Sequence, residues 1–293
     1  EAVYRELMSG SFHLEQPQRI GYVGPVGSYA HWAAIKHFGS SVEYEDLRAI
    51  DGVFVEISRS HVDYGLVPIE SSTGGGGSET MDSFTQFHVD VHVYAEVQLS
   101  VQRCLLANCA PHDVRRIHAS PESYSQCRNW LATQYPQAMI VAAPSSADAA
   151  KAALAEGEAS GAAAIGNVLA GEMYGLHVLF EQIDDRPHEI TRFLVLSRQF
   201  TKPSGDDKTS IMFTTADEPG ALVEVLTVFQ RGGVNLTHID KRPSGRVNWE
   251  YTFFIDAAGH RDEPHFASVV DEARRHCKEL TVLGSYPRSR RVL

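Results

Sequence analysis

Between residues 19 and 198, runs rich in Val, Ile and Leu alternate with runs rich in Ala, and this alternation leaves few folds open to the chain. The first kind of run has the length and β-branched content of strands, whereas the second has the composition of helices. Such alternation predicts an α/β domain with largely parallel sheets. Strands are expected at 19–24, 62–69, 90–101, 115–120, 138–143 and 192–197, and helices at 28–39, 123–135 and 146–157.

The pattern changes beyond TKPSGDDK at 201–208, where Pro, Ser, Gly and Asp cluster as they do in linkers. The residues that follow have the element order βαββαβ, which predicts a small ferredoxin-like domain. Its strands are expected at 209–215, 235–243, 248–257 and 281–286, and its helices at 221–233 and 263–277. We therefore divide the chain into a terminal helix or linker at 1–17, an α/β domain at 18–200, the linker at 201–208, a second domain at 209–288 and a tail at 289–293.

The composition argues against several classes of protein. Acidic residues outnumber basic residues by 37 to 26, and nucleic-acid binding is not expected because such proteins usually present a basic face. No run of 18 apolar residues occurs, so no membrane contact by a spanning helix is expected. No export signal is recognised, and the four cysteines form no CxxC pair. The expected setting is a reducing cytoplasm.

Two glycine-containing turns stand where predicted strands end, at 24–29 (GPVGSY) and 74–77 (GGGG). Neither fits a nucleotide site, because the first lacks the third glycine of a dinucleotide fingerprint and the second is not followed by Lys-Ser or Lys-Thr. Both turns lead through hydroxyl residues into a predicted helix start, where backbone N–H groups hold small anions. We expect the two turns to form an anion-binding cleft, with an ordinary capping turn as the alternative for either turn alone.

Other reactive residues do not form a recognisable centre. His88 and His92 are expected to face solvent from one side of a strand, and no Cys or carboxylate group completes a zinc pattern around them. Cys104 and Cys127 lack a catalytic signature and are interpreted as small core residues. The GxSxG turn of a serine hydrolase is absent.

The segment HEITRFLVLS at 188–197 places Thr191 and Arg192 at the start of an otherwise apolar strand. An arginine at the buried end of a strand is costly unless it is paired. Arg192 is therefore expected to have an anionic partner, which is either a structural carboxylate or a substrate.

Seven collinear segments of the chain resemble the motifs of prephenate dehydratases with a C-terminal ACT regulatory domain. They are GPVGSYAHWAA (24–34), DYGLVPIESSTGG (63–75) followed by Thr80 and Asp82, SPESYSQC (120–127), ITRF (190–193), PGALVEVL (219–226), HIDKRP (238–243) and TVLGSYPR (281–288). The resemblance implies a two-lobed catalytic domain like a periplasmic binding protein, followed by a ferredoxin-like ACT domain. It also implies the conversion of prephenate to phenylpyruvate, with loss of water and carbon dioxide, in phenylalanine biosynthesis, without a metal or organic cofactor.

The resemblance implies roles for particular residues of the catalytic domain. Thr191 would donate a hydrogen bond or a proton to the leaving hydroxyl of prephenate, and Arg192 would support the site or a substrate carboxylate. Phe193 would form part of the wall, and Glu70 completes the expected catalytic set. The residues expected to bind the substrate are Ser28, Ser71, Ser72, Thr73, Gly74, Gly75, Gln126, Ser145 and Ser146.

For the second domain the resemblance implies feedback inhibition by L-phenylalanine. The amino acid would bind at Pro219, Gly220, Ala221, Leu222, Asn235, Leu236, Asp240, Arg242 and Pro243. ACT domains usually pair their sheets side by side, so a dimer or tetramer is expected. The N-terminal segment, with YRELMSG at 4–10, resembles the join after a chorismate mutase domain, so the chain would be the dehydratase and regulatory part of a longer polypeptide.

Several positions depart from the family's pattern. Ser71 and Glu189 stand where the family has Asn, Ser120 where it has His, and Ala30 where a hydroxyl residue is usual; Asp240 and Lys241 replace Glu-Ser. A carboxylate added beside a dianionic substrate is expected to weaken binding unless it is protonated or turned away.

Two alternative functions remain open from the sequence. The first is a prephenate decarboxylase that does not aromatise its product, which the altered asparagines favour and the intact ITRF segment opposes. The second is a non-catalytic sensor of amino acids, because two-lobed α/β domains and ACT domains both serve as binding modules.

Overall fold

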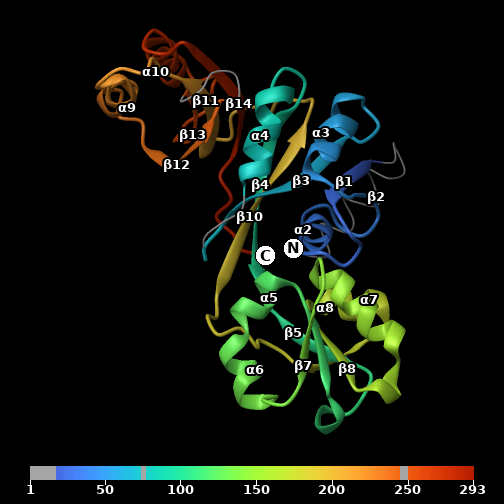
Figure 1. Cartoon of the computed structure of the whole chain (residues 1–293). Helices are drawn as coiled ribbons and strands as arrows, with labels where there is room; N and C mark the ends of the chain where they lie inside the picture. Colours follow the sequence, from blue (N-terminus) through green and yellow to red (C-terminus); the bar gives the residue numbers. More distant parts are fainter. Residues whose placement is uncertain (1–17, 74–76, 245–249) are drawn as a thin grey trace.

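The computed structural model describes residues 18–73, 77–244 and 250–293. The predicted terminal helix at 1–17, Gly74 and Gly75, and the first residues of the strand expected at 248–257 lie outside the described residues. The described chain forms two α/β lobes, one above the other in Figure 1, with a smaller α+β domain beside the upper lobe.

The upper lobe is built on a five-stranded sheet with the order β2-β1-β3-β10-β4. β1, β2 and β3 run parallel, whereas β10 runs antiparallel to both β3 and β4. Apolar residues of α2 cover one face of this sheet, and those of α3 and α4 cover the other. The elements are β1 (Arg19–Val23), α2 (Tyr29–Phe38), β2 (Glu43–Leu47), α3 (Ile50–Ser58), β3 (Tyr64–Ser71), α4 (Ser78–Phe87), β4 (His92–Val101) and β10 (Glu189–Ser197).

The lower lobe has a second mixed sheet with the order β7-β6-β8-β5-β9. Alanines of β8 and α7 pack against each other, and their small side chains let this helix lie close to the sheet. The chain enters the lobe after β4 and returns through β10 (Figure 1). The elements are β5 (Cys104–Ala107), β6 (Arg116–Ala119), α5 (Pro121–Gln126), α6 (Arg128–Gln134), β7 (Met139–Ala142), α7 (Ser146–Glu156), β8 (Ala162–Gly166), α8 (Val168–Tyr174) and β9 (His177–Phe180), with 3₁₀ turns at Pro111–Asp113 and Glu158–Ser160.

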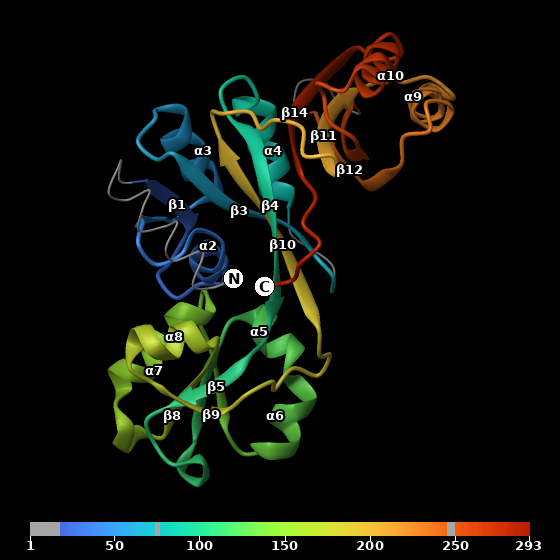
Figure 2. The same ribbon diagram turned by 180° about the vertical axis from the view of Figure 1, so that it is seen from behind.

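The second domain has the predicted βαββαβ order and an antiparallel sheet ordered β12-β13-β11-β14. Ile211 and Phe213 of β11 face the two helices, whereas Met212 between them faces the upper lobe. The face of this sheet that lies away from its own helices therefore packs against α4 and the sheet of the upper lobe, as both Figure 1 and Figure 2 show. The elements are β11 (Asp207–Thr214), α9 (Ala221–Arg231), β12 (Leu236–Pro243), β13 (Tyr251–Ala258), α10 (Pro264–Arg274) and β14 (Glu279–Pro287).

The residues expected to form a tail, 289–293, return to the upper lobe. The Leu293 N–H donates to the Gln98 carbonyl at 2.8 Å, and the Ser100 N–H donates to the Leu293 carbonyl at 3.0 Å. Residues 289–293 thus extend from β14 down the edge of β4 (Figure 2). The second domain is attached to the upper lobe at both of its ends.

The structure corrects the expectation for the two histidines. His88 caps the end of α4 instead of lying on a strand, and His92 is buried at the start of β4 with its ring stacked on Phe200 at 4.1 Å. The four cysteines have free thiols, and three of them are buried. Within the described residues, no helix is long and apolar enough to cross a membrane.

Candidate active site

A cavity of about 630 Å³ lies between the two lobes. One of its walls is the start of β10, where Glu189, Thr191 and Phe193 line the cavity. These residues alternate along the strand and share one face, whereas Arg192 between them points to the opposite face. The sequence ITRF therefore places its threonine and phenylalanine in the cavity and its arginine outside it.

β3 brings the central motif next to Thr191. Thr191 pairs with Ser71 across the antiparallel ladder, and Ser71 and Thr73 line the cavity. Ser72 does not line it: its N–H donates to the Ile190 carbonyl, and its hydroxyl accepts from the Ile190 N–H, both at 2.9 Å. Segments about 120 residues apart in the sequence thus meet within one hydrogen-bonded ladder.

The first turns of three helices also line the cavity. Ser28, Ser120 and Ser145 are the N-caps of α2, α5 and α7, and each hydroxyl accepts a hydrogen bond from a backbone N–H of its helix. N-terminal N–H groups and the helix dipole attract anions. The predicted residues Gln126 and Ser146 lie in the same wall. The cavity is therefore suited to a small ligand that carries carboxylates.

Arg103, which the sequence interpretation missed, is the central charge of this cavity. Its side chain is only 2% exposed, and its Nη1 donates to Glu189 Oε2 and to Asp184 Oδ1, both at 2.7 Å. Among the described residues that line the cavity, Arg103 is the one cation, and it lies close to Glu122 and Glu189. The argument applied to Arg192 would also have identified Arg103, because Arg103 is a lone arginine in an apolar run (VQRCLLA).

Glu189 lies in the cavity wall in its ionised form. Burial by itself raises the pKa of Glu189, but hydrogen bonds and charge from Arg103 outweigh burial and lower it. The hydroxyls of Ser71 and Thr73 donate to Glu189 Oε1 at 2.8 and 3.0 Å. The added carboxylate is therefore ionised, and Arg103 compensates for its charge beside the cavity.

No metal centre is apparent at this site. In the parts of the chain that the structure describes, no group of three His, Cys, Asp or Glu side chains is placed to hold a metal ion.

Comparison with known proteins identifies the family of this chain. Residues 20–201 match the prephenate dehydratase family, and residues 209–274 match the ACT domain. The chain belongs to the prephenate dehydratase family. Its activity is that of a lyase of phenylalanine biosynthesis.

Three similar proteins illustrate how far the likeness extends. A bifunctional chorismate mutase/prephenate dehydratase of Stutzerimonas stutzeri is 42% identical over 289 residues, which cover 98% of this chain and 78% of that protein. A prephenate dehydratase of Amycolatopsis methanolica is 35% identical, over 92% of this chain and 89% of that one. A crystal structure of a prephenate dehydratase from Arthrobacter aurescens in complex with L-Phe is 30% identical, covers 92% and 90% of the two chains, and has a TM-score of 0.85.

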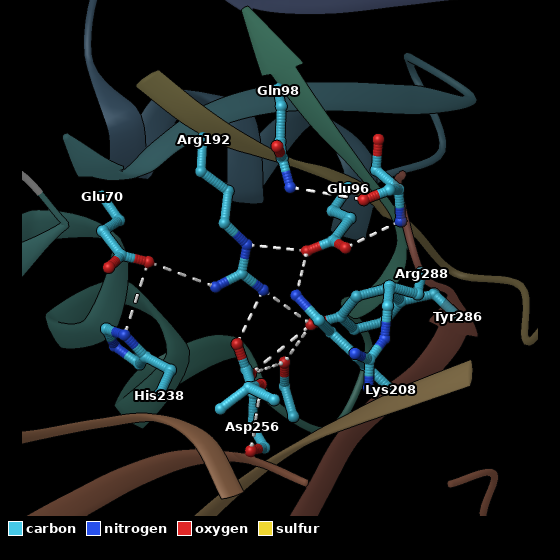
Figure 3. Close-up of polar contacts among 12 residues, drawn as sticks. Glu70, Glu96, Gln98, Arg192, Lys208, His238, Asp256, Tyr286 and Arg288 are labelled. Carbon is cyan, nitrogen blue, oxygen red and sulfur yellow. Dashed lines mark hydrogen bonds and ion pairs between the residues drawn. The ribbon is translucent and has the colours of Figure 1, made fainter. Parts of the chain in front are cut away.

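Arg192 of this dehydratase lies on the face of the sheet that contacts the ACT domain (Figure 3). Its Nε donates to Glu96 Oε2 at 2.7 Å, and its Nη2 lies 2.6 Å from Asp256 Oδ2. The sequence left open whether Arg192 pairs with a structural carboxylate or with a substrate. The structure shows that its partners are structural carboxylates. Glu70 contributes to the cavity wall, but its carboxylate points toward Arg192 and toward His238 of the ACT domain (Figure 3).

The residues expected to bind phenylalanine are divided between different places in the ACT domain. Pro219 and Ala221 line a hollow of about 300 Å³ at the start of α9, where Gly220 adopts φ +90°. Leu222 and Leu236 pack against the ACT core, and the Asn235 carbonyl accepts from the Ala258 N–H.

The HIDKRP segment forms the edge strand β12. Asp240 accepts a hydrogen bond from the Lys241 N–H, and Pro243 ends the strand. Arg242 instead points to the catalytic domain, where its Nε and Nη2 donate to the two carboxylate oxygens of Asp82 at 2.9 and 2.7 Å. The structure therefore brings only part of the predicted set together.

Proposed function

We propose that prephenate binds in the cavity between the lobes with its leaving hydroxyl beside Thr191. The observation that carries this assignment is the shared cavity face of β10, on which Thr191 stands between Glu189 and Phe193. Phe193 supplies an apolar wall for the ring. Ser28, Ser71, Thr73, Gln126, Ser145 and Ser146 supply polar groups around it.

The two carboxylates of prephenate need positive partners in a cavity that also contains glutamates. Arg103 and the N-terminal N–H groups of α2 and α7 provide them. Because Arg103 is held by Asp184 and Glu189, its position is fixed before the substrate arrives. A fixed charge loses little freedom on binding, and it orients the substrate.

The reaction requires little from acid or base groups. The bond between the ring and its carboxylate breaks, the electron pair forms the last double bond of the aromatic ring, and the hydroxyl leaves with a proton as water. Aromatisation drives these steps, so the enzyme needs to orient the substrate and assist the departing oxygen. Thr191 is a weak acid, and we assign it a positional and electrostatic role in addition to donating a hydrogen bond.

The test of this function is product identity. The purified chain is incubated with prephenate, and the product is followed by ultraviolet absorbance and mass spectrometry. Aromatic phenylpyruvate, formed together with carbon dioxide, supports the proposal. A non-aromatic product that has lost carbon dioxide would establish the decarboxylase alternative, and an absence of turnover would favour a sensor.

We further propose that L-phenylalanine inhibits the enzyme by binding the ACT domain at a contact between subunits. The hollow beside Pro219 and Ala221 adjoins a helix N-terminus, which suits an amino-acid carboxylate. β12 is an edge strand, and Ile239 on it is 52% exposed. An exposed edge with an apolar side chain supports pairing of two ACT sheets. Calorimetry with L-phenylalanine and light scattering of the full chain test binding and assembly separately.

A further inference from the structure

Arg192 connects the catalytic strand to the ACT domain. On its own lobe the guanidinium contacts Glu96 of β4 and lies 3.5 Å from Glu70 of β3. Across the domain boundary it contacts Asp256 of β13 at 2.6 Å and the Tyr286 hydroxyl of β14 at 3.0 Å. Arg192 is 7% exposed, so these contacts are shielded from water.

The surroundings of Arg192 hold its partners in place (Figure 3). Asp256 Oδ1 accepts from the Ser210 hydroxyl at 2.6 Å, and Glu96 Oε2 accepts from Lys208 Nζ at 2.9 Å. All three nitrogens of the guanidinium already have partners, and Arg192 does not line the cavity. This arrangement does not suit a direct contact with substrate.

The position of Thr191 depends on this connection through the backbone. Thr191 precedes Arg192 on β10 and pairs with Ser71, whereas Arg192 pairs with Glu70. The Glu70 carboxylate in turn lies 3.5 Å from Nδ1 of His238 on β12. Both strands that meet at Thr191 are thus tied to the ACT domain, and a rotation of that domain must move them or break these contacts.

We propose, resting on the inhibition by phenylalanine proposed above, that Arg192 is a positioning residue through which the arrangement of the ACT domain controls the placement of Thr191. Phenylalanine inhibits by favouring an ACT arrangement in which the Arg192–Asp256 pair no longer holds β10 in its productive position. Such control requires that the ligand prefer one of two arrangements.

The contribution of Arg192 to catalysis is tested with Arg192→Lys in the full chain. Lysine keeps the charge but lacks the planar fork that contacts Glu96 and Asp256 at once. We expect kcat to fall at least tenfold while KM for prephenate stays within about threefold. A raised KM with unchanged kcat would overturn the proposal, because it would mean that Arg192 binds the substrate.

The transmission of inhibition from the ACT domain to β10 is tested with Asp256→Asn. This substitution keeps the size of the side chain and removes the charge that Arg192 contacts. We expect L-phenylalanine to bind this variant as it binds the wild-type chain in calorimetry. Because the Arg192–Asp256 pair is already broken, kcat without phenylalanine should fall several-fold, and saturating phenylalanine should lower it little further. Binding without inhibition is a result that mere loss of folding cannot produce. Tyr286→Phe, which removes one hydroxyl of the same cluster, should show a smaller effect in the same direction.

Asp82→Asn is the matched control, because it breaks the Asp82–Arg242 ion pair across the same domain boundary without touching β10. Its inhibition should remain as in the wild-type chain. Equal loss of inhibition in Asp82→Asn and Asp256→Asn would overturn the specific role of Arg192, as would full inhibition of Asp256→Asn. If the wild-type chain binds no phenylalanine, the proposed regulation fails, and the transmission fails with it. The kcat of Arg192→Lys still decides the positioning role in that case.

Discussion

The Arg103 guanidinium and the Glu189 carboxylate lie 2.7 Å apart in the wall of the cavity, although 86 residues separate them in the sequence. Both side chains are buried, and the Glu189 carboxylate would be costly without this cation. The pair explains how a carboxylate stands beside the cavity of an enzyme whose substrate is a dianion.

Removing the two charges separately should give different effects on KM for prephenate. In Arg103→Gln the Glu189 carboxylate is left buried without its cation, so KM for prephenate should rise at least tenfold, about 1.4 kcal/mol. In Glu189→Gln the arginine keeps Asp184 and gains free charge toward the substrate, so KM should fall or stay unchanged. The double variant should bind prephenate better than Arg103→Gln alone. Steady-state kinetics of the three proteins would contradict the account if both single variants raised KM equally.

The ionised state of Glu189 predicts how stability depends on pH. The folded-state pKa of Glu189 is lowered below the unfolded value of about 4.3. Its contribution is therefore fully present above that value and is lost as the pH falls through the folded-state pKa. The difference in the free energy of unfolding between the wild-type chain and Glu189→Gln, measured with urea, should decrease as the pH is lowered from about 5. An advantage that is constant over this range would contradict the assignment.

Much of this architecture follows from residue patterns that are local in the sequence. Alternating strand-like and Ala-rich runs predicted the α/β lobes, although both sheets are mixed and not largely parallel. The βαββαβ order predicted the second domain, because each pattern records which side of an element is buried. The family motifs brought Thr191 and Ser71 to one site, and the structure pairs them on adjacent strands.

Features that depend on contacts between distant residues were not accessible in this way. The partners of Arg192 come from β3, β4, β13 and β14, and no local pattern selects them. The helix expected at 123–135 is interrupted at Cys127, where α5 ends and α6 begins. The linker ends earlier than expected, since β11 begins at Asp207 and Lys208 joins the buried ion cluster. Polar residues at a segment boundary are interpreted as a loop from the sequence alone, because their partners are distant in the sequence.

Gly220→Val should weaken the binding of phenylalanine while turnover stays near the wild-type value. Gly220 adopts φ +90° at the N-cap of α9, and a β-branched residue there costs roughly 1–3 kcal/mol in backbone strain. Relaxation of this strain displaces the helix start, so Kd for phenylalanine in calorimetry should rise at least tenfold. The matched control is Gly205→Val, because Gly205 has φ +91° in the linker, away from the hollow. Equal effects of the two substitutions would argue against a ligand site at α9.

Ile239→Asp should disrupt assembly of the chain. Ile239 is exposed on the edge strand β12, and a charged residue there opposes pairing of two sheet edges. Light scattering should show a smaller particle for this variant, with unchanged circular dichroism. Val89→Asp, at a 74% exposed position of the catalytic domain, is the control and should assemble as the wild-type chain does. An unchanged particle size for Ile239→Asp would exclude pairing through β12.

The role of Thr191 in the dehydration of prephenate is measured most directly by comparing kcat of Thr191→Ala and Thr191→Ser with that of the wild-type chain at saturating prephenate. Thr191 lines the cavity. Alanine removes its hydroxyl, whereas serine keeps a hydroxyl on the same strand. We expect kcat to fall about 100-fold or more in Thr191→Ala, in line with the loss of a positioned donor, and to stay within about tenfold of wild type in Thr191→Ser. A wild-type kcat in Thr191→Ala would contradict the account, because the hydroxyl would then take no part in the reaction.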